Sequence, residues 1–209
     1  MANQELEDYS KEFSSVQSDI LSRLEAFTIQ NHHGSNMLSG PLQGRFLAMI
    51  SRMLKPKLIV EIGTYTGYSA LCLAEGLPTD GRLITIDTDI NLSSTHESFL
   101  LKSIHADQIV VKYGDAKVLI PAIEGIFDLV FIDGAKKDYL FIYEQCVMRM
   151  RSGGVLLIDN VLWKGKVLEE EKDSVTQAIH DFNHYVRKDQ RVDHVLLPLR
   201  DGIMMVQVK

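Results

Sequence analysis

Short apolar runs that alternate with longer amphipathic stretches limit the fold of this chain more than any other feature. The runs, rich in Val and Ile, span residues 58–62, 83–86, 109–113, 127–132 and 155–158. The stretches between them at residues 69–77, 93–105 and 139–150 are long enough for helices. Strands that are apolar along their whole length are buried on both faces, so the pattern predicts an α/β fold with a parallel sheet between two layers of helices.

The last two apolar runs indicate how the sheet ends. They span residues 192–199 and 202–208, and Arg200-Asp201-Gly202 joins them. An Asp-Gly pair between two strand-like runs is typical of a turn between antiparallel strands. We therefore expect an antiparallel last strand.

The N-terminal part, residues 1–44, has a different pattern. From Leu6 to Phe27 apolar residues recur every three or four positions, which predicts one amphipathic helix with a narrow apolar stripe. Such a stripe suits packing on the main body or against a second subunit. The Gly-, Asn- and Ser-rich stretch Asn31–Gly44 predicts a loop that enters a helix near Pro41.

Composition excludes several classes of function. The 209 residues predict one domain, and 22 Lys and Arg against 28 Asp and Glu give a net charge of −6, which argues against a nucleic-acid partner. No apolar run exceeds five residues, so no membrane-spanning helix is expected. The polar N-terminus does not fit a secretory or mitochondrial leader, and Cys72 and Cys146 predict buried, reduced thiols. These features together predict a cytoplasmic protein.

A glycine-containing turn follows the first predicted strand, where an open parallel sheet binds its ligands. Its sequence is Glu61-Ile-Gly63-Thr-Tyr-Thr-Gly67-Tyr-Ser69. Gly63 and Gly67 let the backbone approach a ligand closely, and a helix that starts near Ser69 favours an anion. The spacing differs from the Gly-x-Gly-x-x-Gly of a pyrophosphate loop, so a carboxylate fits better than a diphosphate. A tight strand-to-helix turn without a ligand is the alternative.

The next two predicted strands end in acids that suit a nucleoside. Asp87 can accept hydrogen bonds from both hydroxyls of a ribose. Asp115 and Ala116 stand where an acid and a small residue can border an adenine ring. Acids at strand ends also cap helices, which is the alternative for Asp87.

Three oxygen ligands follow the fourth and fifth predicted strands. Asp133 ends one strand, and Asp159 and Asn160 end the other. Two carboxylates and an amide describe a site for a hard cation, with Mg²⁺ the best match and Mn²⁺ or Ca²⁺ as alternatives. Each acid taken alone is more often a cap or turn residue, but here all three lie at one edge of the sheet.

Three sequence segments resemble the cation-dependent small O-methyltransferases, the family of catechol and caffeoyl-CoA O-methyltransferases and many bacterial relatives. They are residues 61–89, 127–144 and 153–167, and the resemblance extends from about Met37 to the final DGIMMVQV. It implies the class I methyltransferase fold, a Rossmann-like sheet of seven mostly parallel strands with the last antiparallel. It also implies S-adenosylmethionine as the methyl donor.

The resemblance assigns roles to single residues. The cofactor residues it implies are Met37, Ser39, Glu61, Gly63, Tyr65, Ser69, Asp87, Asp115, Ala116 and Asp133. Met37 and Ser39 would belong to a segment that closes over the cofactor. The implied metal ligands are Asp133, Asp159 and Asn160, and the implied catalytic residues are Lys136, as the base, with Asp133. A homodimer is the assembly expected of the family.

The acceptor is expected to be a small aromatic compound with vicinal hydroxyls, of the catechol or hydroxycinnamate type. Trp163, the only tryptophan, follows Asn160 closely and can form an aromatic wall for such a ring, with core packing as the alternative. The plant branch of the family usually has Asp where this chain has Ala135, which argues against close kinship to the caffeoyl-CoA enzymes.

Other interpretations predict different chemistry. His180 and His184 stand four residues apart and could bind zinc on one helix face, but no third ligand is evident. A nicotinamide-dependent oxidoreductase could use the same sheet, although the Gly-x-Gly-x-x-Gly motif is absent. A catalytically silent binding protein with a methyltransferase fold is the remaining alternative, and binding and turnover assays distinguish it.

Overall fold

The computed structural model describes residues 2–34 and 37–209. The strands are β1 (Leu58–Ile62), β2 (Arg82–Asp87), β3 (Ile109–Tyr113), β4 (Phe127–Ile132), β5 (Met150–Ile158), β6 (Val192–Leu197) and β7 (Ile203–Val208). The α-helices are α1 (Ala2–Glu12), α2 (Asp19–Asn31), α3 (Gly40–Leu54), α4 (Tyr68–Ala74), α5 (Ser93–Phe99), α6 (Ala116–Leu119), α7 (Tyr139–Val147) and α8 (Ser174–Lys188). Short 3₁₀ helices include η3 (Leu100–Lys102) and η7 (Trp163–Leu168).

In the described part of the chain, the strands form one seven-stranded sheet in the order β3-β2-β1-β4-β5-β7-β6. Strands β1 to β5 pair in parallel, and β7 pairs antiparallel with both β5 and β6. The predicted parallel sheet and its antiparallel last strand are therefore confirmed. The strand order reverses at β1 and β4, whose carboxyl ends then offer a crevice for a ligand.

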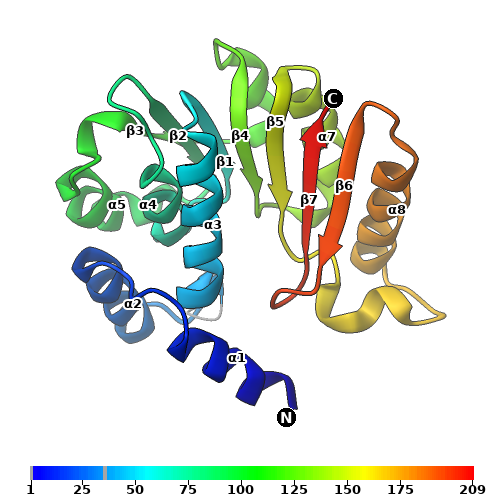
Figure 1. The fold of residues 1–209 in the computed structure, drawn as a ribbon, viewed down its shortest axis with the longest axis horizontal. Helices are drawn as coiled ribbons and strands as arrows, with labels where there is room; N and C mark the ends of the chain where they lie inside the picture. The colour runs from blue at the N-terminus through cyan, green and yellow to red at the C-terminus, as the bar shows by residue number, and fades with distance from the viewer. Residues whose placement is uncertain (1, 35–36) are drawn as a thin grey trace.

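Helices cover the two faces of the sheet (Figure 1). Side chains alternate along a strand, so Val60 and Ile62 of β1 join the core under α7 and α8, whereas Ile59 joins the core under α3 and α4. Burial of each such side chain contributes roughly 1.5–3 kcal/mol. These two cores fix β1 and β4 at the centre of the sheet, and their carboxyl ends form a rigid base for a site.

The N-terminal helix is not continuous, so this prediction was wrong. Helix α1 ends at Glu12 and α2 begins at Asp19, and Ser18 between them is extended. The hydroxyls of Ser10 and Ser14 donate to backbone carbonyls one turn earlier, which competes with helix continuation. Only the second half of the stripe is covered, since Leu24 is buried but Phe13 is 70% exposed. The predicted loop precedes α3 as expected; its residues 35 and 36 lie outside the described residues.

Several element ends differ from the predictions. The helix predicted to reach residue 150 ends at Val147, because Met150 pairs with Phe127 and starts β5. The helix predicted over residues 93–105 ends at Phe99 and continues as η3. The helix predicted over 69–77 covers 68–74, and the strand predicted over 192–199 ends at Leu197.

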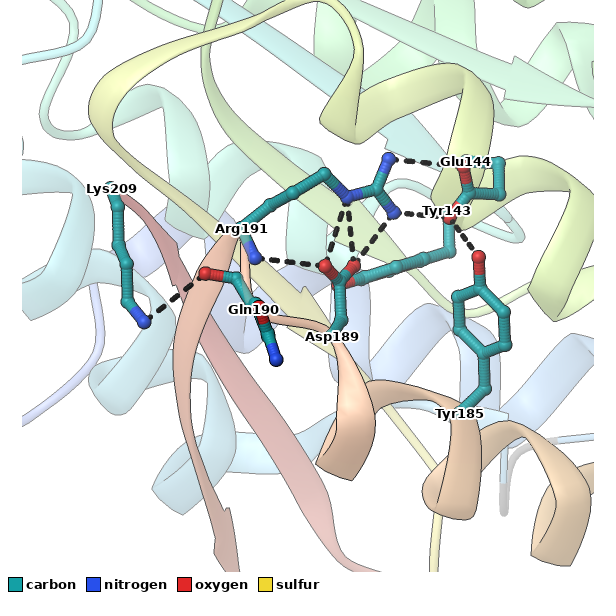
Figure 2. A network of polar contacts seen from close by, with 7 residues as sticks. All are labelled: Tyr143, Glu144, Tyr185, Asp189, Gln190, Arg191 and Lys209. Atoms are coloured by element: carbon teal, nitrogen blue, oxygen red, sulfur yellow. Dashed lines mark hydrogen bonds and ion pairs between the residues drawn. The ribbon is translucent and has the colours of Figure 1, made fainter.

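A polar network joins α7, the end of α8 and the start of β6 (Figure 2). Because β6 runs in the same direction as β5, its start lies at the end of the sheet opposite the carboxyl ends of β1 and β4. The Arg191 guanidinium donates to both carboxylate oxygens of Asp189 and to Glu144 on α7. Asp189 also accepts a 2.9 Å hydrogen bond from the Tyr143 hydroxyl. The network attaches the end of α8 to the core helix α7.

Cys72 and Cys146 are free and buried, as predicted. Among the described residues, no helix combines the length and the apolar character that crossing a membrane requires.

Candidate active site

A cavity of about 1100 Å³ opens at the carboxyl ends of β1, β2, β4 and β5. It brings together most of the predicted site residues. Those that line it are Met37, Gly63, Tyr65, Asp87, Asp115, Ala116, Asp133, Lys136, Asp159, Asn160 and Trp163. Ser39 and Ser69 line a small adjoining pocket that shares Met37, Gly63, Tyr65 and Asp133 with the cavity.

Glu61 lines neither pocket and is fully buried behind the glycine turn. It stands beside Thr85 of β2 in the sheet register, and the Thr85 hydroxyl donates to its Oε2 at 2.5 Å. Its Oε1 is buried without a hydrogen-bond partner among the described residues. Burial raises the pKa of Glu61 to about 8. An unpartnered buried oxygen of this kind suits a hydrogen-bond donor on a ligand or a water molecule.

The glycine turn is held in a conformation that only certain residues allow. Gly63 has φ +97°, and a Cβ there would come within 2.2 Å of the Asp133 carbonyl oxygen. Tyr65 has φ +45°, a strained value for a residue with a side chain. The Tyr65 N–H donates to Asp87 Oδ2 at 2.7 Å, and its carbonyl lies 2.6 Å from Nε2 of His96. The turn is therefore fixed from both sides of Tyr65.

His96 is a site-supporting residue that the sequence did not reveal. It is buried on α5, and its Nδ1 lies 2.7 Å from the hydroxyl of Tyr113. A carbonyl only accepts hydrogen bonds, so Nε2 carries the proton and Nδ1 accepts one from Tyr113. Burial lowers the pKa of His96, which favours this neutral ring.

The acids at the ends of β2 and β3 accept hydrogen bonds from nearby backbone N–H groups and also line the cavity. Asp87 accepts from the N–H groups of Tyr65 and Asp89. Asp115 caps α6 by accepting from the N–H of Lys117. Asp115 therefore caps a helix, which the sequence analysis did not anticipate, and also lines the cavity.

Asp133 and Asp159 end neighbouring strands and form an acidic pair. Ile132 pairs with Ile158 in the register, so the two acids lie side by side. Burial raises the pKa of Asp159, and the charge of Asp133 raises it further. Burial also raises the pKa of Asp133, although the Lys136 ammonium lies 2.8 Å from its Oδ1. Two like charges held together in this way favour a bound cation.

Asn160 and the turn after it are held by Asp201, a second residue that the sequence did not single out. Asn160 has a left-handed backbone conformation with φ +59°. Its Nδ2 donates to Asp201 Oδ2 at 3.4 Å. The Lys164 N–H donates to the other oxygen of Asp201. Trp163 also has a left-handed backbone conformation, with φ +47°, and its half-buried side chain lines the cavity. The Asp-Gly turn that the sequence indicated therefore also supports the site.

The paired histidines do not form a metal centre of the zinc-protease kind. His180 and His184 lie on α8 with their Nε2 atoms 3.1 Å apart, away from the cavity. Over residues 2–34 and 37–209, no group of three or more His, Cys, Asp and Glu side chains is suited to hold a metal. The candidate cation site contains two such side chains and an amide.

Comparison with known proteins agrees with this geometry. The sequence matches the O-methyltransferase family over residues 11–209. It is 31% identical over 191 residues to catechol O-methyltransferase domain-containing protein 1 of Mus musculus, covering 88% of this chain and 72% of that protein. It is 30% identical over 179 residues to a catechol O-methyltransferase of Niastella koreensis, covering 81% of each.

A solved structure extends the similarity to three dimensions. The methyltransferase PaMTH1 of Podospora anserina, solved with SAH bound, superposes with a TM-score of 0.91 at 26% identity, covering 100% of this chain and 95% of that one. The sheet order with its antiparallel β7 is that of the class I methyltransferase fold. These findings favour methyl transfer over the nicotinamide alternative. The chain belongs to the O-methyltransferase family and is an S-adenosylmethionine-dependent O-methyltransferase of the catechol and caffeoyl-CoA type.

Proposed function

We propose that this enzyme transfers the methyl group of S-adenosylmethionine to one hydroxyl of a small aromatic vicinal diol, with the help of a divalent cation. The observation that carries the proposal is the position of Asp133, Asp159 and Asn160 beside Lys136 in one cavity. The Niastella koreensis relative named catechol O-methyltransferase supports the acceptor class.

The cation-site residues fit a hard divalent cation. Asp133 and Asp159 offer carboxylate oxygens whose mutual repulsion a cation relieves. Asn160 donates its Nδ2 to Asp201, and its Oδ1 has no hydrogen bond among the described residues. We propose Mg²⁺ as the cation, with Mn²⁺ or Ca²⁺ as alternatives, because these ions prefer oxygen ligands.

The cofactor residues fit a nucleoside sulfonium that carries an amino acid. The Tyr65 hydroxyl and Glu61 Oε1 are buried without partners among the described residues, which suits a polar ligand. We propose that Gly63, Tyr65, Ser69 and Glu61 hold the methionine end. Asp87 would hold the ribose.

The remaining cofactor contacts complete this proposal. Asp115 and Ala116 would border the adenine, and Asp133 would contact the cofactor as well as the cation. Met37 and Ser39 would cover the cofactor, since both stand between α2 and α3 beside the glycine turn.

Residues of this chain would position the reactants, supply a base and form an aromatic wall beside the acceptor. The cation supplies positive charge that lowers the pKa of a chelated hydroxyl. Lys136 lies at the acidic pair and would accept the proton of the attacking hydroxyl. Trp163 would pack against the ring of the acceptor and align it. Fixing the reactants in this way can supply roughly 7–11 kcal/mol of the barrier.

Two expectations from the sequence stay proposals about this enzyme. The exposed apolar side chains of α1, including Leu6 and Tyr9, are consistent with a homodimer. The second expectation is that the enzyme is cytoplasmic, and we keep it as a proposal.

The proposal is tested with a pair of acceptors. Purified protein with S-adenosylmethionine and Mg²⁺ is given catechol or phenol, and methylated product is measured. We expect catechol to be methylated and phenol not, because phenol cannot chelate a cation through two hydroxyls. Equal methylation of both compounds, or of neither, would contradict the proposed acceptor class. Calorimetric titration with S-adenosylmethionine separates a silent binding protein from a wrong choice of acceptor.

A further inference from the structure

Gln43 connects a buried helix to the candidate cation site. It lies in the first turn of α3 and is fully buried. Its Nε2 donates to Oδ2 of Asp159 at 2.6 Å. A buried amide is unfavourable unless it is hydrogen bonded, so this contact specifies where the side chain points.

The contact determines how Asp159 presents its carboxylate. The Asn160 N–H donates to Asp159 Oδ1 at 2.7 Å, while Gln43 donates to Oδ2. Each carboxylate oxygen thus has one donor from the protein, and a carboxylate has about four lone-pair positions. The remaining positions are available to the cavity that Asp159 lines.

Arg200 extends this contact to the segment before α3. Its Nη1 lies 3.4 Å from Oε1 of Gln43 and donates to the Leu38 carbonyl at 2.7 Å. It also donates to the Ser39 carbonyl. Leu38 and Ser39 line the small pocket beside the glycine turn. One hydrogen-bonded chain therefore runs from Asp159 through Gln43 and Arg200 to the segment that lies over the proposed cofactor.

We propose that Gln43 is a positioning residue that orients Asp159 toward the cation and, through Arg200, links cation binding to cofactor binding. The inference rests on the proposed function, because it requires a cation at Asp159. Residues behind a metal ligand change metal affinity by about 10–100-fold when they are removed. A residue that only fills space beside Asp159 would leave that affinity unchanged.

The variant Gln43→Met tests the first part, because it keeps the size of the side chain and removes the amide. Mn²⁺ binding to metal-free protein is measured by electron paramagnetic resonance, with and without SAH. We expect Mn²⁺ affinity to fall about 10–100-fold, with SAH affinity in the absence of metal unchanged. Gln177→Met is the matched control, since Gln177 is exposed on α8 and donates only to Asp181.

The variant Arg200→Met tests the second part. It keeps the contact between Gln43 and Asp159 and removes a positive charge that acts on Asp133, so Mn²⁺ affinity without SAH should not fall below that of the wild type. Any increase in Mn²⁺ affinity that SAH causes in the wild type should be lost. Thermodynamic linkage requires that the increase in SAH affinity caused by Mn²⁺ disappears equally.

The outcomes separate the inference from the proposed function. Wild-type protein that fails to bind Mn²⁺ contradicts both. Wild-type binding together with an unchanged Gln43→Met affinity overturns the inference alone. Absence of coupling between SAH and Mn²⁺ in the wild type overturns the link through Arg200. Should Gln43→Met not fold, Gln43→Asn keeps an amide that is one methylene too short to reach Asp159, and the same loss of affinity is expected.

Discussion

The ammonium of Lys136 lies 2.8 Å from Oδ1 of Asp133, three residues earlier in the chain. The same carboxylate would therefore serve the proposed base and the proposed cation. This arrangement places the proton acceptor next to the charge that activates the acceptor hydroxyl.

Replacing Lys136 with Met should change turnover and metal affinity in opposite directions. Loss of a general base lowers turnover by about 10²–10⁴-fold. Removing a positive charge beside Asp133 should raise Mn²⁺ affinity by about fivefold, equivalent to roughly 1 kcal/mol of electrostatic repulsion. Steady-state kinetics and Mn²⁺ titration check both effects, and a variant with wild-type turnover would remove Lys136 from the mechanism.

Glu61 should make the stability of the ligand-free protein depend on pH. Burial raises its pKa from 4.5 to about 8, so the folded state binds this proton more tightly than the unfolded chain. The Glu61 contribution to the free energy of unfolding is therefore full below about pH 4.5. It decreases by up to about 1.4 kcal/mol per pH unit until about pH 8.

The variant Glu61→Gln keeps the shape of the side chain and cannot ionise. Urea unfolding of both proteins at a series of pH values should show the variant gaining stability over the wild type as pH rises to about 8. A stability difference that does not change with pH would show that Glu61 is not buried as an ionisable group.

His96→Phe should weaken cofactor binding without touching the cavity directly. The substitution keeps a ring beside Tyr113 but leaves the Tyr65 carbonyl without its donor. A lost buried hydrogen bond costs about 1–3 kcal/mol, so we expect SAH affinity to fall about tenfold. Tyr113→Phe removes only the distant hydrogen bond and is the control. Equal SAH affinity in the wild type and His96→Phe would show that the glycine turn keeps its conformation without the hydrogen bond from His96.

Arg191→Met should reduce stability and leave turnover intact, because none of the residues of the network in Figure 2 lines the cavity. Hydrogen bonds from Arg191 lower the pKa of Asp189 to about 2. We expect a loss of about 1–2 kcal/mol in the free energy of unfolding near neutral pH. This difference should shrink as pH falls from about 4 through about 2, the pKa of Asp189 in the folded state, because Asp189 becomes protonated. Thermal unfolding across this range, with turnover at neutral pH, checks the prediction.

The sheet was predictable because its central strands are buried on both faces. Residues 58–62 and 127–132, at the centre of the sheet, form strands with the predicted ends, and so do residues 109–113 at its edge. The same parallel arrangement brought Asp87, Asp133 and Asp159 to one edge, since parallel strands place their carboxyl ends together.

The parts that were not predicted depend on contacts between distant or competing groups. At the break before Asp19, serine hydroxyls compete for backbone carbonyls, and apolar spacing carries no signal of this competition. Gln43 and Asp159 are 116 residues apart, and Gln43 and Arg200 are 157 apart. No local pattern marks such a pair, so the support behind the cation site becomes visible only in three dimensions.

Metal dependence of methyl transfer tests the central claim most directly. Metal-free protein is given S-adenosylmethionine and catechol, first with a chelator and then with added Mg²⁺, and Asp159→Ala is measured in parallel. We predict no product with the chelator, full activity with Mg²⁺, and no metal-dependent turnover by Asp159→Ala, whose SAH affinity should stay within about threefold of the wild type. Equal turnover with chelator and with Mg²⁺, or metal-dependent turnover by Asp159→Ala equal to that of the wild type, would contradict the account.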